Sequence, residues 1–233
     1  MHMPQKILRG CLFVALLCLA QGLAARESPD QLPMYGGLDR AADPHLRKVD
    51  EDFIARVSKE FGSREKASES WVDEGIRFYL DDNYKKAMQR FNQAWLLNPS
   101  NSGAFWGFAM VYHDKGQPCE ALTMIERAET LGLSKPIALA DAGRITTLCG
   151  AKDTSMSQEA REELNARSEA LYQRADQAAP NNDYILSSWA TAYYWRGDYA
   201  AAWTKVSEAR AAGGTLPGPF INMLREKMPE PKE

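Results

Sequence analysis

The residues that could perform chemistry in this sequence are few and widely spaced. The chain has 4 cysteines and 3 histidines in 233 residues. Cys119 and Cys149 are too far apart to form the Cys-x-x-Cys pair of redox proteins, and His45 and His113 have no ligand-like neighbours at zinc-site spacing. We therefore expect no metal site and no other cofactor.

Sequence signatures of catalysis are also absent. The chain has no Gly-x-Ser-x-Gly nucleophile turn, no His-Glu-x-x-His helix and no phosphate-binding loop. Asp81 and Asp82 lie in a predicted turn, and Glu162 and Glu163 lie on a predicted polar helix face, where carboxylates are ordinarily solvated. We expect no catalytic residues and predict that the protein is not an enzyme.

Residues 1–25 have the features of a cleaved secretory signal peptide. Lys6 and Arg9 precede an apolar run that starts at Cys11, and small residues follow up to Ala25. The run is about half of the roughly 20 residues that span a membrane, so a retained anchor is the less favoured alternative. We expect an exported, periplasmic protein with no membrane span after cleavage, in an oxidising compartment.

The charge balance argues against two classes of partner. The chain has 28 Lys and Arg against 31 Asp and Glu. Removal of residues 1–25 takes away two basic residues and no acidic one, which leaves 26 against 31, a net charge of −5. Without a long basic run, such a chain does not favour nucleic acid or a membrane surface.

Large and small side chains recur at a fixed spacing through the middle of the chain. Frames that begin at Ser68, Ser102 and Asp183 share a pattern with a 34-residue period. The shared places hold Trp71, Gly75, Phe78, Tyr84, Ala87, Phe91, Ala94 and Pro99; Phe105, Ala109, Tyr112, Ala121, Ile125 and Ala128; and Leu186, Ala190, Tyr193, Tyr199, Ala202 and Ala209. The pattern resembles the tetratricopeptide repeat, whose unit is a pair of antiparallel helices.

The stretch that begins at Pro136 departs from this regularity. Its first-helix pattern is intact, but the second-helix pattern around Ser168 and Tyr172 comes later than a regular unit allows. Ser157 followed by Gln158 is typical of a helix start, so we predict an elongated second helix. The alternative is that this stretch is not a repeat.

The resemblance implies an all-α fold, a right-handed superhelical stack of about four helix-turn-helix hairpins over residues 68–214. We expect a flexible tether at 26–42, an N-terminal capping helix at 43–63 that begins with Asp43 and Pro44, and a C-terminal capping helix and tail at 215–233.

Stacking of this kind places the start of one second helix beside the end of the next first helix. It therefore implies that Cys119 and Cys149 form a disulfide, and the alternative is two separate buried thiols.

The resemblance also implies a concave groove lined by the first helix of each unit. The groove places hold Val72, Ile76, Tyr79, Trp106, Met110, His113, Arg144, Tyr184, Thr191, Tyr194 and Trp195. The set is aromatic and apolar with one positive charge, and it lacks the lysines and asparagines with which some family members bind a peptide C-terminus. Part of the set could belong to the core instead.

From this groove we expect a non-enzymatic protein-protein interaction adaptor or scaffold of the bacterial cell envelope. Its partner would be a protein or peptide that presents an extended or apolar segment, with Trp106 and Trp195 as anchors. The alternatives are a self-associating structural subunit, which would form a homo-oligomer, and a glycan- or lipid-binding accessory module of a cell-wall complex.

Overall fold

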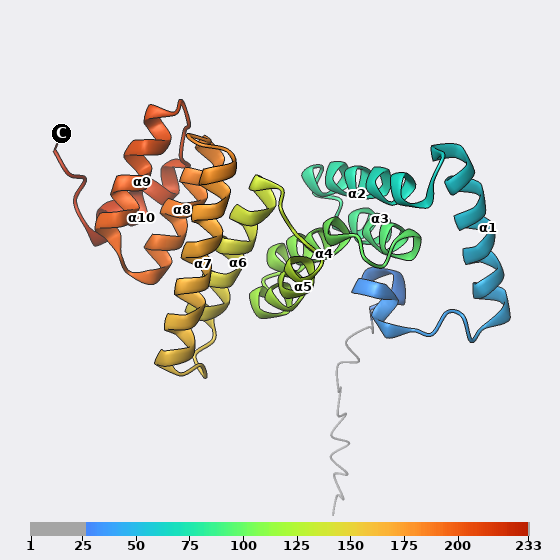
Figure 1. Ribbon diagram of the computed structural model, residues 1–233. Coiled ribbons are helices and arrows are strands. Elements are labelled where there is room, and N and C mark those ends of the chain that lie inside the picture. Colours follow the sequence, from blue (N-terminus) through green and yellow to red (C-terminus); the bar gives the residue numbers. More distant parts are fainter. Residues whose placement is uncertain (1–26, 233) are drawn as a thin grey trace, which may run out of the picture.

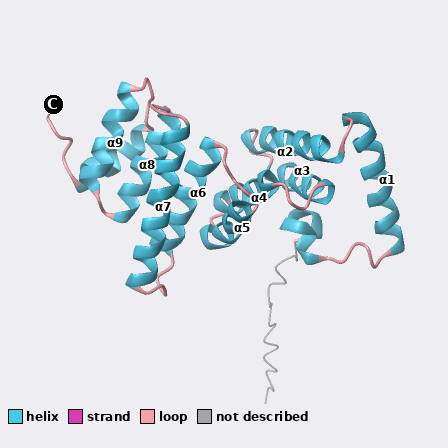
Figure 2. Cartoon of the chain, viewed as in Figure 1, coloured by secondary structure: helices cyan, strands magenta, loops and turns pink. Residues whose placement is uncertain are grey.

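The computed structural model describes residues 27–232 of the chain. These residues form helices joined by short loops, and none of them is in a strand (Figures 1 and 2). This confirms the prediction of an all-α protein. The predicted signal peptide, residues 1–25, lies outside the described residues.

Two short 3-10 helices precede ten α-helices within residues 27–232. Their bounds are η1 Pro29–Gln31, η2 Pro33–Gly37, α1 Pro44–Phe61, α2 Arg64–Leu80, α3 Tyr84–Leu97, α4 Ser102–Asp114, α5 Pro118–Thr130, α6 Pro136–Lys152, α7 Gln158–Ala178, α8 Asp183–Arg196, α9 Tyr199–Ala211 and α10 Gly218–Lys227.

Polar caps determine where two of these helices begin. The Asp43 carboxylate accepts hydrogen bonds from the backbone N–H groups of His45 and Leu46 at the start of α1, where Pro44 is the first helical residue. The Ser157 hydroxyl caps α7 in the same way, and α7 then continues for 21 residues. The long helix at this position therefore begins at the residue that the sequence indicated.

Consecutive helices pack as hairpins. The pairs are α2 with α3, α4 with α5, α6 with α7 and α8 with α9, and α6 also contacts α5 and α8. Figure 1 shows α6 to α9 as one block, in which α6 and α7 run across the direction of α2 and α3.

Glycines allow helices to approach closely, both within hairpins and between them. The fully buried ring of Phe91 on α3 lies against both Gly75 of α2 and Gly107 of α4, and a Cβ atom at Gly75 would be 2.5 Å from a ring carbon. Gly143 of α6 faces the ring of Tyr172 on α7 in the same way, at 2.8 Å. A larger residue at these places would force the rings to move.

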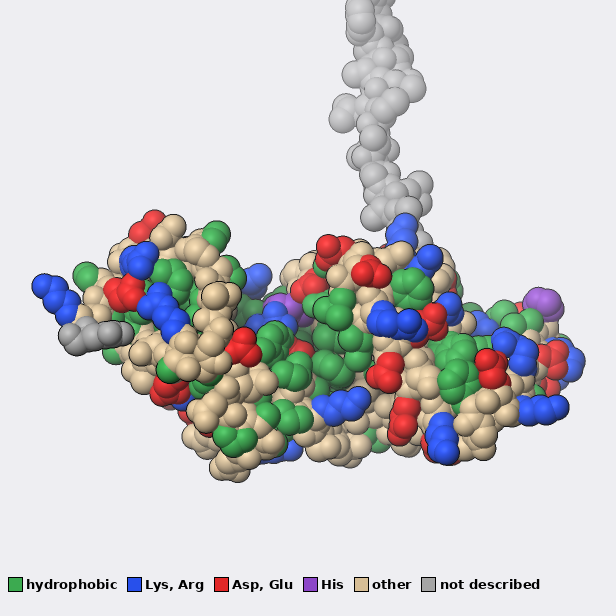
Figure 3. Space-filling view, turned by 90° about the horizontal axis from the view of Figure 1, so that it is seen from above, with side chains coloured by type: hydrophobic (Ala, Val, Ile, Leu, Met, Phe, Trp, Pro, Cys, Tyr) green, Lys and Arg blue, Asp and Glu red, His purple; other side chains and the backbone are tan. Residues whose placement is uncertain are grey.

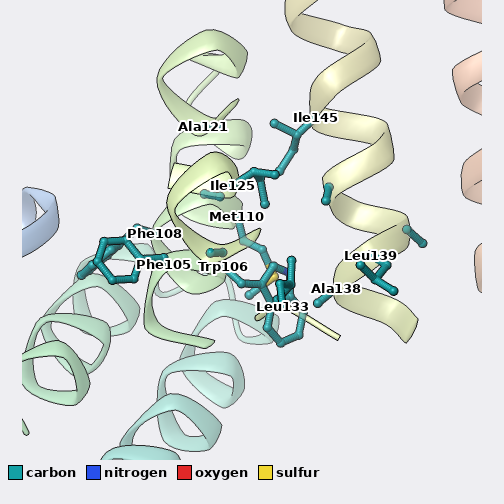
Figure 4. Close-up of a cluster of buried hydrophobic side chains, with 14 of the residues drawn as sticks. Phe105, Trp106, Phe108, Met110, Ala121, Ile125, Leu133, Ala138, Leu139 and Ile145 are labelled. Carbon is teal, nitrogen blue, oxygen red and sulfur yellow. The ribbon is translucent and has the colours of Figure 1, made fainter. Parts of the chain in front are cut away.

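Buried side chains of α4, α5 and α6 form the middle of the core (Figure 4). Phe105 and Phe108 lie on one side of α4, with their rings edge to face at 5.9 Å. Trp106 lies near Met110 and Leu133 on the side that faces α6. Because α4 is buried on both sides, its sequence is almost continuously apolar.

Cys119 at the start of α5 and Cys149 near the end of α6 form a disulfide, with Cα atoms 4.7 Å apart. This confirms the predicted pairing. The bond joins residues separated by 30 positions, and in the chain-entropy view such a crosslink stabilises the fold by about 3 to 4 kcal/mol.

The segment before α1 is docked on α3. The buried amide of Asn92 accepts a hydrogen bond from the Tyr35 N–H at 3.1 Å and donates to the carbonyls of Asp30 and Leu32 at 3.1 and 2.9 Å. We had expected a flexible tether at 26–42. The described part of it is instead held in place because one buried amide meets three of its backbone groups.

The end helices cover the two ends of the helical array. Phe53 and Phe61 of α1 pack edge to face on Trp71 of α2, with ring centroids 5.7 and 5.5 Å apart. At the other end, Trp203 of α9 donates its Nε1–H at 3.0 Å to the carbonyl of Met228, just after α10. No helix within residues 27–232 is both long enough and apolar enough to cross a bilayer.

Candidate binding groove

The predicted groove residues lie on α2, α4, α6 and α8, but they differ in accessibility. Val72, Trp106 and Met110 are buried, with 2%, 6% and 4% of their surface exposed, and they belong to the core. Tyr184 and Trp195 are each 42% exposed. The half-buried members are Ile76, Tyr79, His113, Arg144, Thr191 and Tyr194.

One pocket, with a volume of about 370 Å³, lies between α2, α4 and the loop that leads into α6. We call it the α2–α4 pocket. Its apolar and charged lining comprises Val72, Trp106, Leu133, Glu69, Asp73 and Lys135. Two of the predicted groove residues, Val72 and Trp106, therefore line it although they are largely buried.

A second pocket, of about 520 Å³, lies between α6, α8 and the segment that leads into α10. We call it the α8 pocket. Its lining includes Arg144, Tyr184, Ser187, Thr191, Leu216 and Phe220. Three of these were predicted groove residues. Leu216 and Phe220 come from the C-terminal capping region at 215–233, and neither was among the predicted groove residues.

Asp141 of α6 connects the two pockets. Its side chain is 3% exposed and accepts hydrogen bonds from Trp106 Nε1 at 3.0 Å and from Arg144 Nη2 at 2.9 Å. It also accepts one from the Tyr184 hydroxyl. The three donors come from α4, α6 and α8, so a single carboxylate orients residues of both pockets.

Sequence reasoning did not identify Asp141. The available signal was an acidic residue in the apolar stretch from Pro136 to Cys149, three places before Arg144. An acidic and a basic residue at this spacing on an apolar helix indicate a buried ion pair.

His113 of α4 extends this network. Arg144 Nη1 donates to His113 Nε2 at 3.0 Å, and because a guanidinium cannot accept, the imidazole accepts. Burial, together with the Arg144 charge, lowers the pKa of His113 to about 4, so the ring is neutral at pH 7. Burial alone would lower the pKa of Arg144, because it disfavours the charged guanidinium. The nearby Asp141 carboxylate has the larger effect and raises the pKa of Arg144.

The same causes affect two tyrosines. Burial and the Asp141 carboxylate raise the pKa of Tyr184. Burial and the Asp114 carboxylate raise the pKa of Tyr79. Both phenols therefore stay protonated and serve as hydrogen-bond donors.

The remaining predicted groove residues lie outside the linings of both pockets. Tyr79 packs on Tyr84 at the α2–α3 turn, with ring centroids 5.7 Å apart. Tyr194 packs edge to face on Trp195 and on Phe220, at 5.6 and 5.8 Å. The others are Ile76, Met110, His113 and Trp195.

A second polar cluster lies behind the groove, between α6, α7 and α8. Arg196 donates to the Ser168 hydroxyl at 2.6 Å and to the Glu169 carboxylate at 3.0 Å. Ser168 donates to the carbonyl of Gly143 at 2.7 Å and lies 2.8 Å from the Thr147 hydroxyl. These groups hold α8 against the α6–α7 hairpin, and they do not line either pocket.

The lining of both pockets offers groups that can recognise a bound segment. Hydroxyl groups, apolar side chains and a few charges can bury and hydrogen-bond a bound segment. Among residues 27–232, no three His, Cys, Asp or Glu side chains are close enough to hold a metal ion. On the face seen in Figure 3, hydrophobic side chains gather near the middle of the molecule, between charged side chains of its two halves.

No protein-family model matches the chain, and no curated protein matches it significantly.

Proposed function

We propose that the chain is a non-catalytic adaptor that binds an extended segment of a partner protein across the α2–α4 pocket and the α8 pocket. One observation carries this proposal. The two pockets are lined by side chains of α2, α4, α6 and α8, the first helices of consecutive hairpins. The same Asp141 carboxylate orients a lining side chain in each pocket, Trp106 in one and Arg144 in the other. A segment that crosses both pockets would meet a preorganised surface, which reduces the entropic cost of binding.

The proposal includes membership of the tetratricopeptide-repeat class, with a right-handed superhelical stack of hairpins. Its support is the 34-residue pattern together with the helix pairing and with the close contacts at Gly75 and Gly143. The fold class alone does not name a partner, because such repeats serve many unrelated roles.

We further propose that the protein works in the bacterial cell envelope, in the periplasm. The Cys119–Cys149 disulfide supports this location, because such bonds persist in oxidising compartments. The signal-like sequence of residues 1–25 supports it independently.

The adaptor function can be tested by photo-crosslinking in cells. A photoreactive amino acid would replace Ser187, which lines the α8 pocket, and in a control it would replace Ala170, which is exposed on α7. We expect one dominant protein adduct from position 187 and none from position 170. Equal labelling at the two positions would contradict a groove-specific partner.

A second arm of the experiment tests the expected anchor. Trp195→Ala removes an apolar side chain that is 42% exposed on α8, and Met223→Ala removes one that is 39% exposed on α10. The adduct should weaken with the first change and persist with the second. If the adduct is a second copy of this chain, self-association replaces the adaptor function, and sedimentation at rising concentration would show it.

A further inference from the structure

The α2–α4 pocket contains two carboxylates that have no cationic partner in the described chain. Glu69 and Asp73 are exposed and lie one turn apart on α2. Neither forms an ion pair within residues 27–232, although Lys135 lines the same pocket. Like charges at this spacing repel each other and weaken a helix slightly, so the pairing of Glu69 with Asp73 does not stabilise α2.

The rest of the pocket suits the body of a long side chain. Val72 and Leu133 offer apolar surface, and Trp106 adds an aromatic ring. The hydrogen bond from Trp106 Nε1 to Asp141 fixes the indole in place. An aromatic ring close to carboxylates is a favourable setting for a cation, because the ring's quadrupole attracts it.

We propose that the α2–α4 pocket receives a lysine or arginine side chain of the partner segment. This inference rests on the proposed function and specifies the chemistry of its ligand. The methylene stem would contact Val72 and Leu133 while the charged end reaches Glu69 and Asp73. With Lys135 included, the pocket's three charged side chains sum to −1, which favours a cationic occupant over an anionic one.

The test uses small probes and does not require the partner. Nα-acetyl-lysine methylamide and Nα-acetyl-arginine methylamide supply the cationic side chains, and Nα,Nε-diacetyl-lysine methylamide supplies the same stem without charge. The indole N–H signal of Trp106 in a ¹H–¹⁵N spectrum reports binding, and Trp106→Phe assigns that signal. We expect the cationic probes to shift it, with the neutral probe roughly five- to ten-fold weaker.

Paired variants connect the effect to the two carboxylates. Glu69→Gln with Asp73→Asn should abolish the shift. Glu162→Gln with Glu163→Gln removes the same charge from the exposed face of α7 and should leave the shift unchanged. Equal binding of the neutral probe, or an unchanged shift in the Glu69 and Asp73 variant, would overturn the proposal.

The photo-adduct at position 187 separates this inference from the proposed function. If the probes fail to bind and the adduct is retained at full strength in the Glu69→Gln, Asp73→Asn variant, the adaptor function stands and the basic residue is excluded. If the cationic probes bind but no adduct forms, the pocket chemistry stands and the adaptor function falls.

Discussion

The two halves of the molecule join their hairpins in different ways. In the N-terminal half, α2, α3 and α4 meet around the buried ring of Phe91, which is pressed between two glycines. In the C-terminal half, the Tyr172 ring on Gly143 repeats this contact within the α6–α7 hairpin, but hydrogen-bonded side chains, among them Ser168 and Arg196, connect α8 to that hairpin. The hairpins also differ in length, because α7 of the C-terminal half has 21 residues and α3 of the N-terminal half has 14.

The difference predicts which kind of substitution should destabilise each half most. A junction held by shape is sensitive to volume, because close-packed atoms cannot move apart without losing contacts. A junction held by buried polar groups is sensitive to charge, because an unpaired buried group loses its solvation without compensation. Four changes test this contrast.

The largest expected effect is at the apolar junction. Phe91→Ala removes a fully buried ring between α2 and α4 and should lower the free energy of unfolding by about 3 to 5 kcal/mol. Urea denaturation followed by circular dichroism measures it. Phe220→Ala removes the same ring from a half-buried position on α10 and is the comparison, and it should cost less. A loss below about 1 kcal/mol at Phe91 would contradict a packed junction.

The next effect concerns the link between the halves. Replacing Cys119 and Cys149 with serine should lower the free energy of unfolding by about 3 to 4 kcal/mol, since the unfolded chain regains the entropy that the closed loop had removed. A reducing agent should produce a similar loss in the wild-type protein and none in the double variant. Equal stability of oxidised and reduced wild-type protein would show that the bond adds nothing.

At the polar groove, Asp141→Asn leaves the Arg144 guanidinium without its counter-charge. We expect a loss of about 2 to 3 kcal/mol, below the value for a fully buried pair because the Arg144 side chain is 23% exposed. Asp81→Asn, in an exposed turn, is the matched control and should change stability by less than about 0.5 kcal/mol. The same loss of stability in both variants would contradict a stabilising role for the Asp141 carboxylate in the groove.

The smallest effect depends on pH. His113 has a folded pKa of about 4 against an ordinary value of 6.5, so the unfolded chain binds the extra proton between these values and stability falls as the pH falls through that window. At pH 5 the loss should be about 2 kcal/mol relative to pH 7. His113→Gln should make the stability curve flatter by this amount, and parallel curves for the two proteins would refute it.

Several elements could be predicted because their signals are local. Asp43 with Pro44 and Ser157 mark helix starts through groups that lie within one turn of them. The disulfide followed from the order of helices that the repeat pattern implies. Burial was harder to predict, because Trp106 occupies a groove place in the pattern yet is 6% exposed.

What the sequence by itself determined is the helical content and the period of its pattern, and the resemblance that this pattern carries pointed to Cys119 and Cys149 as a pair that the structure then joined. These depend on near neighbours along the chain or on spacing that repeats along it. Only the tertiary structure decided that Asn92 holds the segment before α1, that Asp141 connects the two pockets and that Phe220 closes one of them. The physical reason is that a buried polar group takes its partners from distant helices, and a helical pattern does not show which distant groups will meet it.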